Sequence, residues 1–202
     1  MNCSRNWLAR CVFGLAVCAL TAPRVCAEDV GGRWGTEERE REYYPVVNVP
    51  IPKGLVIESG AYCLLPDGRM AVGTRHGEIY ILSGTDEKRP NPTYRLFATG
   101  LDEIFGLAHK DGAFYVTQSC ELTRVTDTKR NGKADRFETV SDAWGYANYH
   151  EYAFGSKFDS EGNLYVALGL SNSYDSYALF RGFALKVTPD GKTKALASGL
   201  RS

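Results

Sequence analysis

The sequence lacks an excess of either charge and, beyond its N-terminal segment, any long hydrophobic run. Its 24 basic and 24 acidic side chains balance, and 44% of its residues are hydrophobic. These values exclude a highly charged disordered chain and a polybasic segment that binds nucleic acid. No later apolar stretch reaches the roughly 20 residues that span a bilayer. What remains is a folded domain, and 21 glycines with 12% aromatic residues predict one rich in turns and strands.

The one hydrophobic run lies at the N-terminus. Arg5 and Arg10 precede an apolar stretch over residues 11–22, and residues 25–27 read Val-Cys-Ala, a small-residue cleavage site. This pattern predicts a signal peptide over residues 1–27, and therefore export to the periplasm, the cell surface or the medium. Three arginines and no acid leave with the peptide, so the mature chain would carry three more acidic than basic residues.

Cysteine is scarce once this peptide is set aside. Four of the six cysteines lie within it, which leaves Cys63 and Cys120. Two cysteines exclude a disulfide framework, and although one bridge stays open, two unpaired and partly buried thiols are the simpler interpretation. The sequence has no Cys-x-x-Cys-His motif, so we expect no covalently bound haem on this segment.

Two segments precede the first regular pattern. Residues 28–44 are rich in charge, with acids and arginines mixed over 37–42, and predict a solvated N-terminal arm. Residues 45–52 are β-branched but interrupted by prolines, which cannot donate to a strand ladder. We expect an edge strand here that could close a sheet formed elsewhere, and we place the domain itself over residues 45–202.

Within this domain one sequence pattern occurs three times. Each copy has short β-branched or aromatic strands separated by tight turns, and each ends in a fourth short strand. The turn glycines Gly68, Gly112 and Gly162 mark the same position in successive copies. Four-stranded units that repeat at this spacing are typical of propeller blades. We therefore expect an all-β fold, a β-propeller, with four-stranded blades near residues 55–99, 100–142 and 150–200.

Three blades do not close a ring, because propellers have about four to eight. The triplet Thr-Gly-Leu at 99–101 leads from the first unit into the second, and Ser-Gly-Leu at 198–200 repeats it after the third. We therefore expect these blades to be the N-terminal part of a propeller of about six.

The strand order of such a blade brings the turn after its second strand and the link to the next blade to one end. Propeller ligands usually bind at an end, over the central channel. Residues 144–152, dense in aromatics, enter the third blade there. His150 within them is the candidate catalytic base, because an imidazole can take a proton near neutral pH. The alternative is a histidine that bonds a neighbouring carbonyl. His76 and His109 are weaker candidates, a turn residue and a strand-end residue.

One loop has the spacing of a calcium-binding loop. Asp127, Asn131, Asp135 and Glu138 match positions 1, 5, 9 and 12 of the 12-residue calcium loop, and a glycine stands at position 6. Lys129 occupies position 3, where an acid is usual. A structural calcium site and a plain Asn-Gly turn with solvated charges are the two interpretations.

Two motifs resemble a known family. The hairpin Val-Gly-Thr-Arg-His-Gly-Glu-Ile at 72–79, and His150 followed by Phe-Asp-Ser-Glu-Gly-Asn-Leu-Tyr at 158–165, resemble the six-bladed glucose/sorbosone dehydrogenases that use pyrroloquinoline quinone (PQQ). The chain is similar in particular to exported propeller modules of planctomycete-type bacteria, described as membrane-bound dehydrogenase domains. The resemblance covers about residues 43–202. It implies oxidation of a sugar or polyol with PQQ, with His150 removing the hydroxyl proton, and a downstream haem-carrying domain or other electron acceptor.

The same resemblance leaves two other functions open. Leu-Asp-Glu at 101–103 replaces the family's glutamine-bearing turn, Gly169-Leu170 replaces a Gly-Asp pair, and the arginines that hold the quinone would come from later blades. One alternative is a non-catalytic propeller that binds carbohydrate or protein through its aromatic residues. The other is a lactonase-type hydrolase, whose calcium would need Asn148 and Glu151. Nothing in the sequence indicates a nucleic-acid partner.

Overall fold

The computed structural model describes residues 37–85, 88–147, 150–170 and 176–201, with side chains from residue 40 onward. The chain divides into two units, Met1–Val46 and Val47–Ser202. The first contains α2 (Glu37–Tyr43), and the described side chains that follow it are exposed. The predicted signal peptide lies outside the described residues. Among those that are described, no helix is long and apolar enough to cross a membrane.

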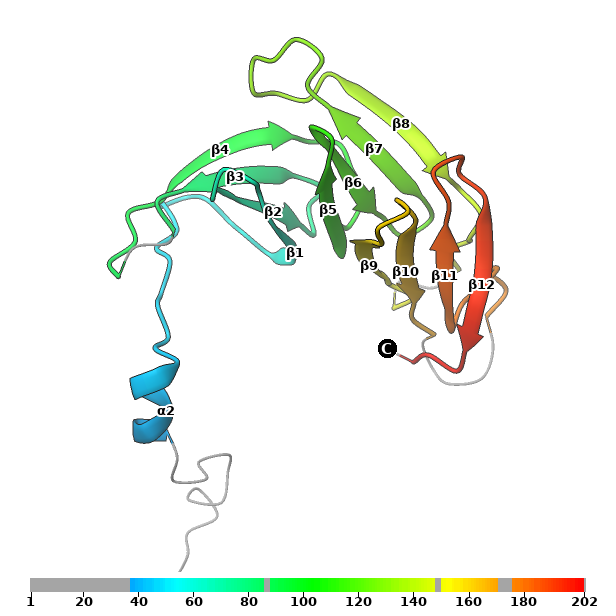
Figure 1. Cartoon of the computed structure of the whole chain (residues 1–202), viewed down its shortest axis with the longest axis horizontal. Coiled ribbons are helices and arrows are strands. Elements are labelled where there is room, and N and C mark those ends of the chain that lie inside the picture. Colours follow the sequence, from blue (N-terminus) through cyan, green and yellow to red (C-terminus); the bar gives the residue numbers. More distant parts are fainter. Residues whose placement is uncertain (1–36, 86–87, 148–149, 171–175, 202) are drawn as a thin grey trace, which may run out of the picture. The chain divides into compact units, whose positions relative to one another are not determined.

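The second unit consists of short antiparallel strands in three groups of four, which we call blades (Figure 1). The first blade contains β1 (Ser59–Leu64), β2 (Met70–Thr74), β3 (Ile79–Ser83) and β4 (Thr93–Ala98). The second contains β5 (Gly106–Lys110), β6 (Ala113–Thr117), β7 (Leu122–Thr126) and β8 (Arg136–Ser141). The third contains β9 (Ala153–Phe158), β10 (Leu164–Leu168), β11 (Phe183–Val187) and β12 (Thr193–Ser198).

Within each blade every strand pairs with the next one in sequence. The first strands β5 and β9 also meet side by side through one parallel pair, Gly106 and Gly155, which joins the second and third blades into one hydrogen-bonded sheet. A Cβ atom added to Gly106 would overlap the carbonyl oxygen of Gly155, so glycine is what allows the two first strands to approach this closely. Neighbouring first strands are expected of blades around a common axis.

The turn glycines lie where the repeat predicted them. Gly68, Gly112 and Gly162 join the first two strands of their blades, and all three have positive φ angles of 73° to 85°. Glycine adopts this conformation without the steric cost that a Cβ atom would bring. The recurring Gly in the sequence therefore marks the recurring hairpin.

The hydrophobic core lies between the blades. Side chains alternate along each strand, so one face of every blade packs against the next blade. One cluster fills the space between the first and second blades, and contains Ile79, Ile81, Ile104, Leu107, Phe114 and Val116. A second fills the space between the second and third, and contains Leu122, Trp144, Leu164, Val166, Leu168 and Leu185. Burial of each large aliphatic side chain contributes about 1.5–3 kcal/mol, which holds the blades in register.

Two sequence-based expectations need correction. Residues 45–52 form no strand. The chain that follows residue 47 lies instead against the free face of the first blade, where Tyr94 donates a hydrogen bond to the carbonyl of Pro50 and where Ile57 packs on Tyr80 and its neighbours. Its prolines have no N–H to pair, so packing of its apolar side chains decides its position. In the blade expected near residues 100–142, the first strand begins only at Gly106, because the N–H of Ile104 donates to Thr74 of the preceding blade.

Candidate functional site

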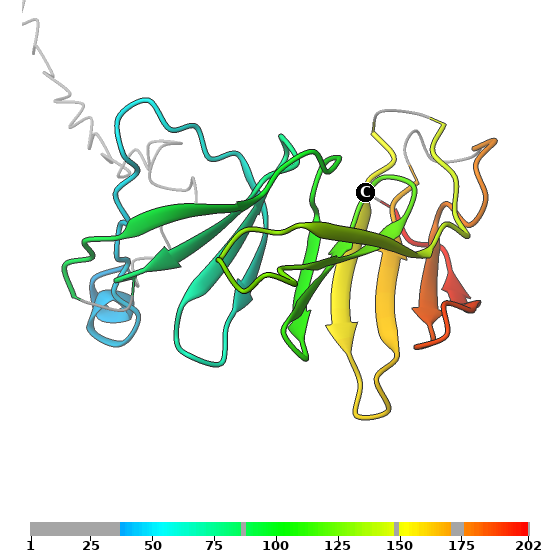
Figure 2. The same cartoon turned by 90° about the horizontal axis from the view of Figure 1, so that it is seen from above.

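The two ends of the blades differ in what they carry. The β1–β2, β5–β6 and β9–β10 turns reach the lower edge of Figure 2, and we call this the hairpin end. The β2–β3 and β6–β7 turns and the links between blades lie at the other end, the channel end. Strand order alone predicts this division. The channel end is where residues of all three blades come together.

Five residues there form what we call the central cluster: Arg75, Glu103, Phe105, Tyr152 and Phe154. The ring centroids of Phe105 and Tyr152 are 4.6 Å apart, and those of Phe105 and Phe154 are 5.4 Å apart. The guanidinium carbon of Arg75 lies 5.8 Å and 5.7 Å from the Phe105 and Tyr152 centroids. Arg75 also donates to Glu103, with 2.6 Å between Nη2 and Oε1. One blade supplies the cation, the next an aromatic ring, and the third two further rings.

The chemistry of this cluster combines flat apolar faces with an ion pair. The side chain of Arg75 is 43% exposed and that of Glu103 is 24% exposed, so both can reach a ligand from solvent. The hydrogen bond to Glu103 raises the pKa of Arg75, so the guanidinium is charged at any physiological pH. Aromatic faces beside hydrogen-bonding groups suit sugars and other polyols, whose rings are apolar on their faces and polar at their edges.

His150 lies two residues before Tyr152, at the channel end. Its side chain is exposed. Consecutive Cα atoms are 3.8 Å apart, so the backbone of His150 is at most about 7.6 Å from that of Tyr152. The structure thus places the candidate base at the same end of the blades as the central cluster. Its role in catalysis stays a prediction.

A buried ion pair fixes the segment around His150. Arg181, 5% exposed, donates from Nε to the carbonyl of Gly145 at 2.9 Å, from Nη1 to Tyr152 at 3.2 Å and from Nη2 to Ser119 at 2.6 Å. Its Nε lies 3.7 Å from Oε2 of Glu151, which is 1% exposed. Burial lowers the pKa of Arg181, and Glu151 opposes this. The guanidinium therefore holds both ends of the segment that carries His150.

This role of Arg181 could not be found by sequence reasoning, which placed its loop at the channel end but named no partner. Ser119 is 62 residues away, and no local pattern links the two. Glu151 was considered as a calcium ligand for a lactonase-type site, together with Asn148. Its carboxylate instead accepts the N–H of Ala147 at 3.2 Å and faces Arg181. Asn148 lies outside the described residues.

The aromatic residues around His150 separate into two groups. Trp144 is 2% exposed and packs in the core between the second and third blades, so it offers no face to a ligand. Tyr146 is 46% exposed, and Tyr152 belongs to the central cluster. Only part of the aromatic-rich segment that we predicted as a stacking surface therefore faces solvent.

The other two histidines have structural surroundings. His76, in the β2–β3 turn, is exposed, with its Nε2 3.6 Å from a carboxylate oxygen of Glu58. His109 is half-buried at the hairpin end, with its ring centroid 5.1 Å from that of Phe114, and burial lowers its pKa. Both observations agree with their lower rank as candidates.

The predicted calcium loop is the β7–β8 loop at the hairpin end. Its first ligand candidate, Asp127, accepts the backbone N–H groups of Asn131 at 3.1 Å and Gly132 at 2.5 Å. The side-chain oxygen of Asn131 accepts the N–H of Lys133 at 3.0 Å. These contacts are those of a tight Asx-type turn closed by its own backbone.

The other two candidates are also engaged. Asp135 accepts the backbone N–H of Thr128 at 2.7 Å, and this bond lowers the pKa of the carboxyl. Glu138 forms ion pairs of 2.7 Å with Arg124 and 2.6 Å with Arg136. Among the described residues, no three His, Cys, Asp or Glu side chains gather as a metal site. This arrangement does not fit a calcium ion, and binding would require these contacts to rearrange; it stays a prediction.

Cys63 and Cys120 are both free. Cys63 lies in β1, and Cys120 is exposed in the β6–β7 turn at the channel end. Both thiols are unpaired, as predicted, but of the two only Cys63 is partly buried.

A family model matches residues 53–200, which is most of the chain, and its description is "Domain of unknown function (DUF7133)". The chain belongs to the DUF7133 family. No protein of curated function matches the sequence significantly. The matched range takes in all three blades, the central cluster, His150 and Arg181, so these features belong to the family's domain.

Solved structures match this DUF7133 chain at low sequence identity. The PQQ-bound form of an aldose sugar dehydrogenase from Streptomyces coelicolor matches with a TM-score of 0.51 and 19% identity, over 68% of this chain and 46% of that one. A luciferin-regenerating enzyme matches with a TM-score of 0.50 and 14% identity, over 72% and 47%. An oxidoreductase described as a glucose dehydrogenase, from Thermus thermophilus, has a TM-score of 0.49 and 24% identity, over 73% and 48%.

These likenesses concern the fold. Together with the all-β blades described above, they confirm the predicted propeller architecture. The chain spans about half the length of the solved structures it matches.

Proposed function

We propose that the protein is an exported β-propeller that binds a sugar or polyol at the channel end and, in its complete form, oxidises it with PQQ. The observation that supports this most is the central cluster, in which one cation–anion pair and three aromatic rings from three blades meet at the end that carries His150. The relatives named as sugar dehydrogenases share the fold and make an oxidised sugar the first substrate class to test.

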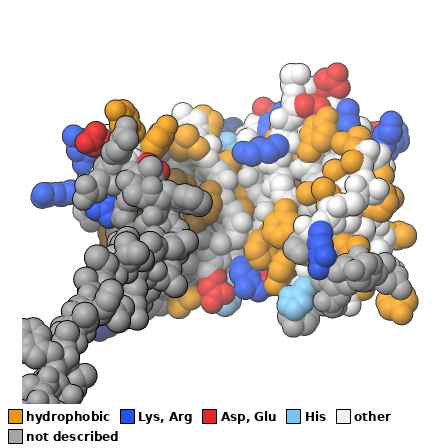
Figure 3. Space-filling model, turned by 90° about the horizontal axis from the view of Figure 1, so that it is seen from below, with side chains coloured by type: hydrophobic (Ala, Val, Ile, Leu, Met, Phe, Trp, Pro, Cys, Tyr) orange, Lys and Arg blue, Asp and Glu red, His pale blue; other side chains and the backbone are white. Residues whose placement is uncertain are grey.

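The surface agrees with a neutral, polar ligand. On the side where β5 and β9 lie, the visible part of Figure 3 shows hydrophobic patches with basic and acidic side chains scattered between them. Such a mixed surface offers stacking and hydrogen bonds without a strong electrostatic potential of one sign. A sugar ring would stack on Phe105 or Tyr152, while Arg75 and Glu103 bond its hydroxyl groups.

In this proposal His150 takes the proton of the hydroxyl group that is oxidised, and the carbon-bound hydrogen leaves with two electrons as hydride. PQQ, when bound, supplies the acceptor for that hydride. Arg181 and Glu151 hold the His150 segment at a fixed place, which a general base requires because proton transfer needs hydrogen-bond reach. A haem-carrying domain or another electron acceptor would then take the electrons onward.

The described residues fit one edge of PQQ. PQQ would lie on whichever of the Phe105 and Tyr152 rings the sugar leaves free, and Arg75 could pair with one of its carboxylates while Glu103 bonds the sugar. Glu103 already accepts from Nε and Nη2 of that arginine, so further cations would have to come from elsewhere in the complete protein.

The test is dye-linked oxidation of a panel of aldoses and polyols by the full-length protein with PQQ and calcium. We expect turnover by the wild type and a loss of about 100-fold or more in kcat for His150→Ala, the usual effect of a general base. His76→Ala is the matched control, since His76 is an exposed turn histidine at the same end. Absence of turnover on the whole panel, or unchanged turnover in His150→Ala, would overturn the proposal.

A non-catalytic carbohydrate-binding propeller is the second candidate. The central cluster favours it equally, because stacking and ion-pair contacts bind a sugar without any base. Glycan binding by the wild type without oxidation, weakened several-fold by Phe105→Ala or Tyr152→Ala but not by His150→Ala, would establish this function instead.

A further inference from the structure

A cavity lies at the hairpin end, between the first and second blades. The cavity there, which we call the first groove, measures about 430 Å³, within the range of ligand pockets. Arg69, Arg95, His109, Arg130 and Asn131 line its polar side. Phe97 and Phe114, with ring centroids 5.0 Å apart, belong to its apolar side. Nothing in the proposed oxidation uses this groove.

The guanidinium of Arg95 is held in place by a neutral group. Its Nη2 donates to the carbonyl of Asn131 at 2.5 Å, and Gly132 packs so closely that a Cβ atom added there would overlap the guanidinium. A carbonyl fixes the geometry of an arginine but leaves its charge uncompensated. The remaining N–H groups of Arg95 stay available to an oxyanion.

The charges around the groove do not cancel. In the part of the chain that the structure describes, no ion pair with a carboxylate is formed by Arg95 or Arg130. Arg69 pairs with Asp67 at 2.7 Å. Asp127 is the one acid among the described residues that line the groove, and its carboxylate accepts two backbone N–H groups of its own loop. Two arginines thus face one acid that is already engaged.

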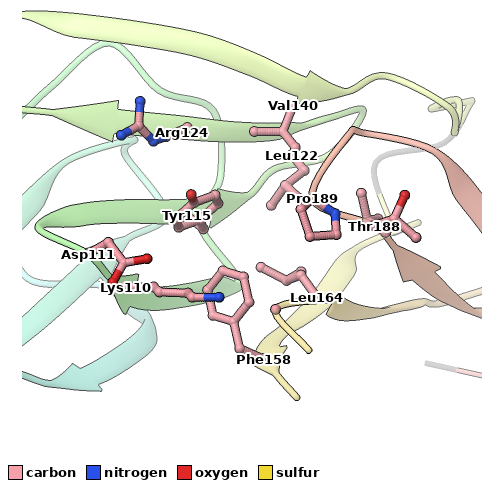
Figure 4. A pocket seen from close by; sticks show the side chains of 12 residues that line it. Lys110, Asp111, Tyr115, Leu122, Arg124, Val140, Phe158, Leu164, Thr188 and Pro189 are labelled. Carbon is pink, nitrogen blue, oxygen red and sulfur yellow. The ribbon is translucent and has the colours of Figure 1, made fainter. Parts of the chain in front are cut away.

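The equivalent cavity between the second and third blades, the second groove, shows that this is not a general property of the fold. It measures about 230 Å³. Leu122, Val140, Leu164 and Pro189 gather on one side of it, and Lys110 extends along the ring of Phe158, 4.9 Å from its centroid (Figure 4). Its arginine, Arg124, pairs with Glu138 at 2.7 Å.

We propose that the first groove binds an oxyanion, a carboxylate or a sulfate or phosphate ester, between Arg95 and Arg130. Arginine donates two parallel hydrogen bonds to such groups, and Asn131 adds a side-chain amide donor. Phe97 and Phe114 lie edge to face, and because Phe114 is only 4% exposed, it is the ring of Phe97 that would contact a sugar bearing the anionic group. The ligand class is therefore an acidic or esterified sugar, or the free anion of the same chemistry.

The test is isothermal titration of the full-length protein with D-glucuronate, D-glucose 6-sulfate, inorganic sulfate and, as the neutral comparison, D-glucose. We expect the first two to bind more tightly than glucose, with affinity that falls as salt rises. Arg95→Gln and Arg130→Gln should each weaken binding about tenfold or more, because a charge-assisted hydrogen bond is lost. Arg124→Gln, the matched control in the second groove, should leave binding unchanged.

Comparing glucuronate with inorganic sulfate distinguishes an anionic group carried by a sugar from a free anion. Tighter binding of glucuronate than of inorganic sulfate supports a sugar-borne group, and equal binding supports the free anion. A Tm measured for each variant shows that it is folded. Absence of anion binding, equal binding of glucose, or equal losses in Arg95→Gln and Arg124→Gln would overturn the proposal. None of these outcomes depends on whether the protein oxidises sugars.

Discussion

The first and second grooves lie between blades of the same strand order but differ in whether their arginine has an acidic partner. In the first blade, the third residue of β3 is Ile81, and its cross-strand partner in β4 is Arg95. In the second blade, the third residue of β7 is Arg124, and its partner in β8 is Glu138. An arginine therefore stands at this pair in both blades, but only in the second blade is its cross-strand neighbour an acid.

This difference shows that the blade fixes where an arginine stands in the sheet. Its cross-strand neighbour determines whether the charge of that arginine is compensated. Opposite charges directly across an antiparallel pair of strands form an ion pair and stabilise the sheet. An arginine opposite isoleucine has no such partner and keeps its charge for a ligand. The third blade has Leu185 opposite Ala195, so the same pair carries no charge at all there.

Loop length reinforces the difference. The loop between β7 and β8 covers residues 127–135, whereas the turn between β11 and β12 covers only 188–192. The longer loop brings Asn131 and Gly132 onto Arg95 of the preceding blade. The shorter turn places Thr188 and Pro189 at the second groove, so an apolar ring stands where the first groove has an amide.

The largest expected effect would sharpen the contrast between a buried and a half-exposed arginine–glutamate pair. Arg181→Met should destabilise the protein by about 3–5 kcal/mol, because it leaves Glu151 buried without a counter-charge. Arg124→Met, which breaks a half-exposed pair, should cost at most about 1 kcal/mol. Chemical denaturation of both variants measures the two losses.

A second variant keeps this prediction decisive. Arg181→Met combined with Glu151→Gln removes the buried charge while leaving an acceptor for Ala147, and should recover part of the lost stability. If Arg181→Met were no more harmful than Arg124→Met, the buried pair would not be the element that fixes the His150 segment.

Sequence reasoning could predict the blades because their signals are local. The turn glycines and the alternating strands lie within a few residues of one another, and the structure has Gly68, Gly112 and Gly162 in the hairpins that the pattern predicted. The division into two ends followed from strand order. The aromatic segment 144–152 was therefore expected at the channel end before any contact was known.

The contacts themselves could not be predicted in this way. The central cluster needs Phe105 and Tyr152, 47 residues apart, to lie against each other, and this depends on how the first strands of two blades meet. Arg95 and Asn131 are likewise 36 residues apart. The loop at 127–138 shows the same limit, since its spacing predicts a calcium site, but the spacing does not indicate that its side chains contact nearby N–H groups and arginines.

A glycine substitution tests whether the loop holds Arg95 as described. Gly132→Ala should weaken glucuronate binding about tenfold, because the new Cβ atom displaces the guanidinium, and should lower stability by about 1 kcal/mol through its positive φ of 81°. Gly68→Ala is the control, since its φ is 85° but no atom lies within 4 Å of the added Cβ. Gly68→Ala should show a similar loss of stability with unchanged glucuronate binding. A thermal scan measures the stability, and isothermal titration measures the binding. Equal binding losses in the two variants would contradict the contact.

The smallest expected effect concerns the turn acid Asp159. Its hydrogen-bond partners lie in its own turn and in the strand that follows. Asp159, in the β9–β10 turn, accepts hydrogen bonds from Asn163, Tyr165 and Glu161, and the Asn163 side chain is the main cause that lowers its pKa to about 2. An aspartate with a lowered pKa stabilises the folded state above its unfolded pKa of about 3.9, and this stabilisation is lost as the pH falls toward about 2.

Asp159→Asn should therefore reduce the dependence of Tm on pH between about 4 and 2. Asn163→Ala should raise the pKa of Asp159, as followed by NMR of its carboxyl carbon. An Asp159 that titrates near 3.9 in the wild type would show that this turn does not hold its acid.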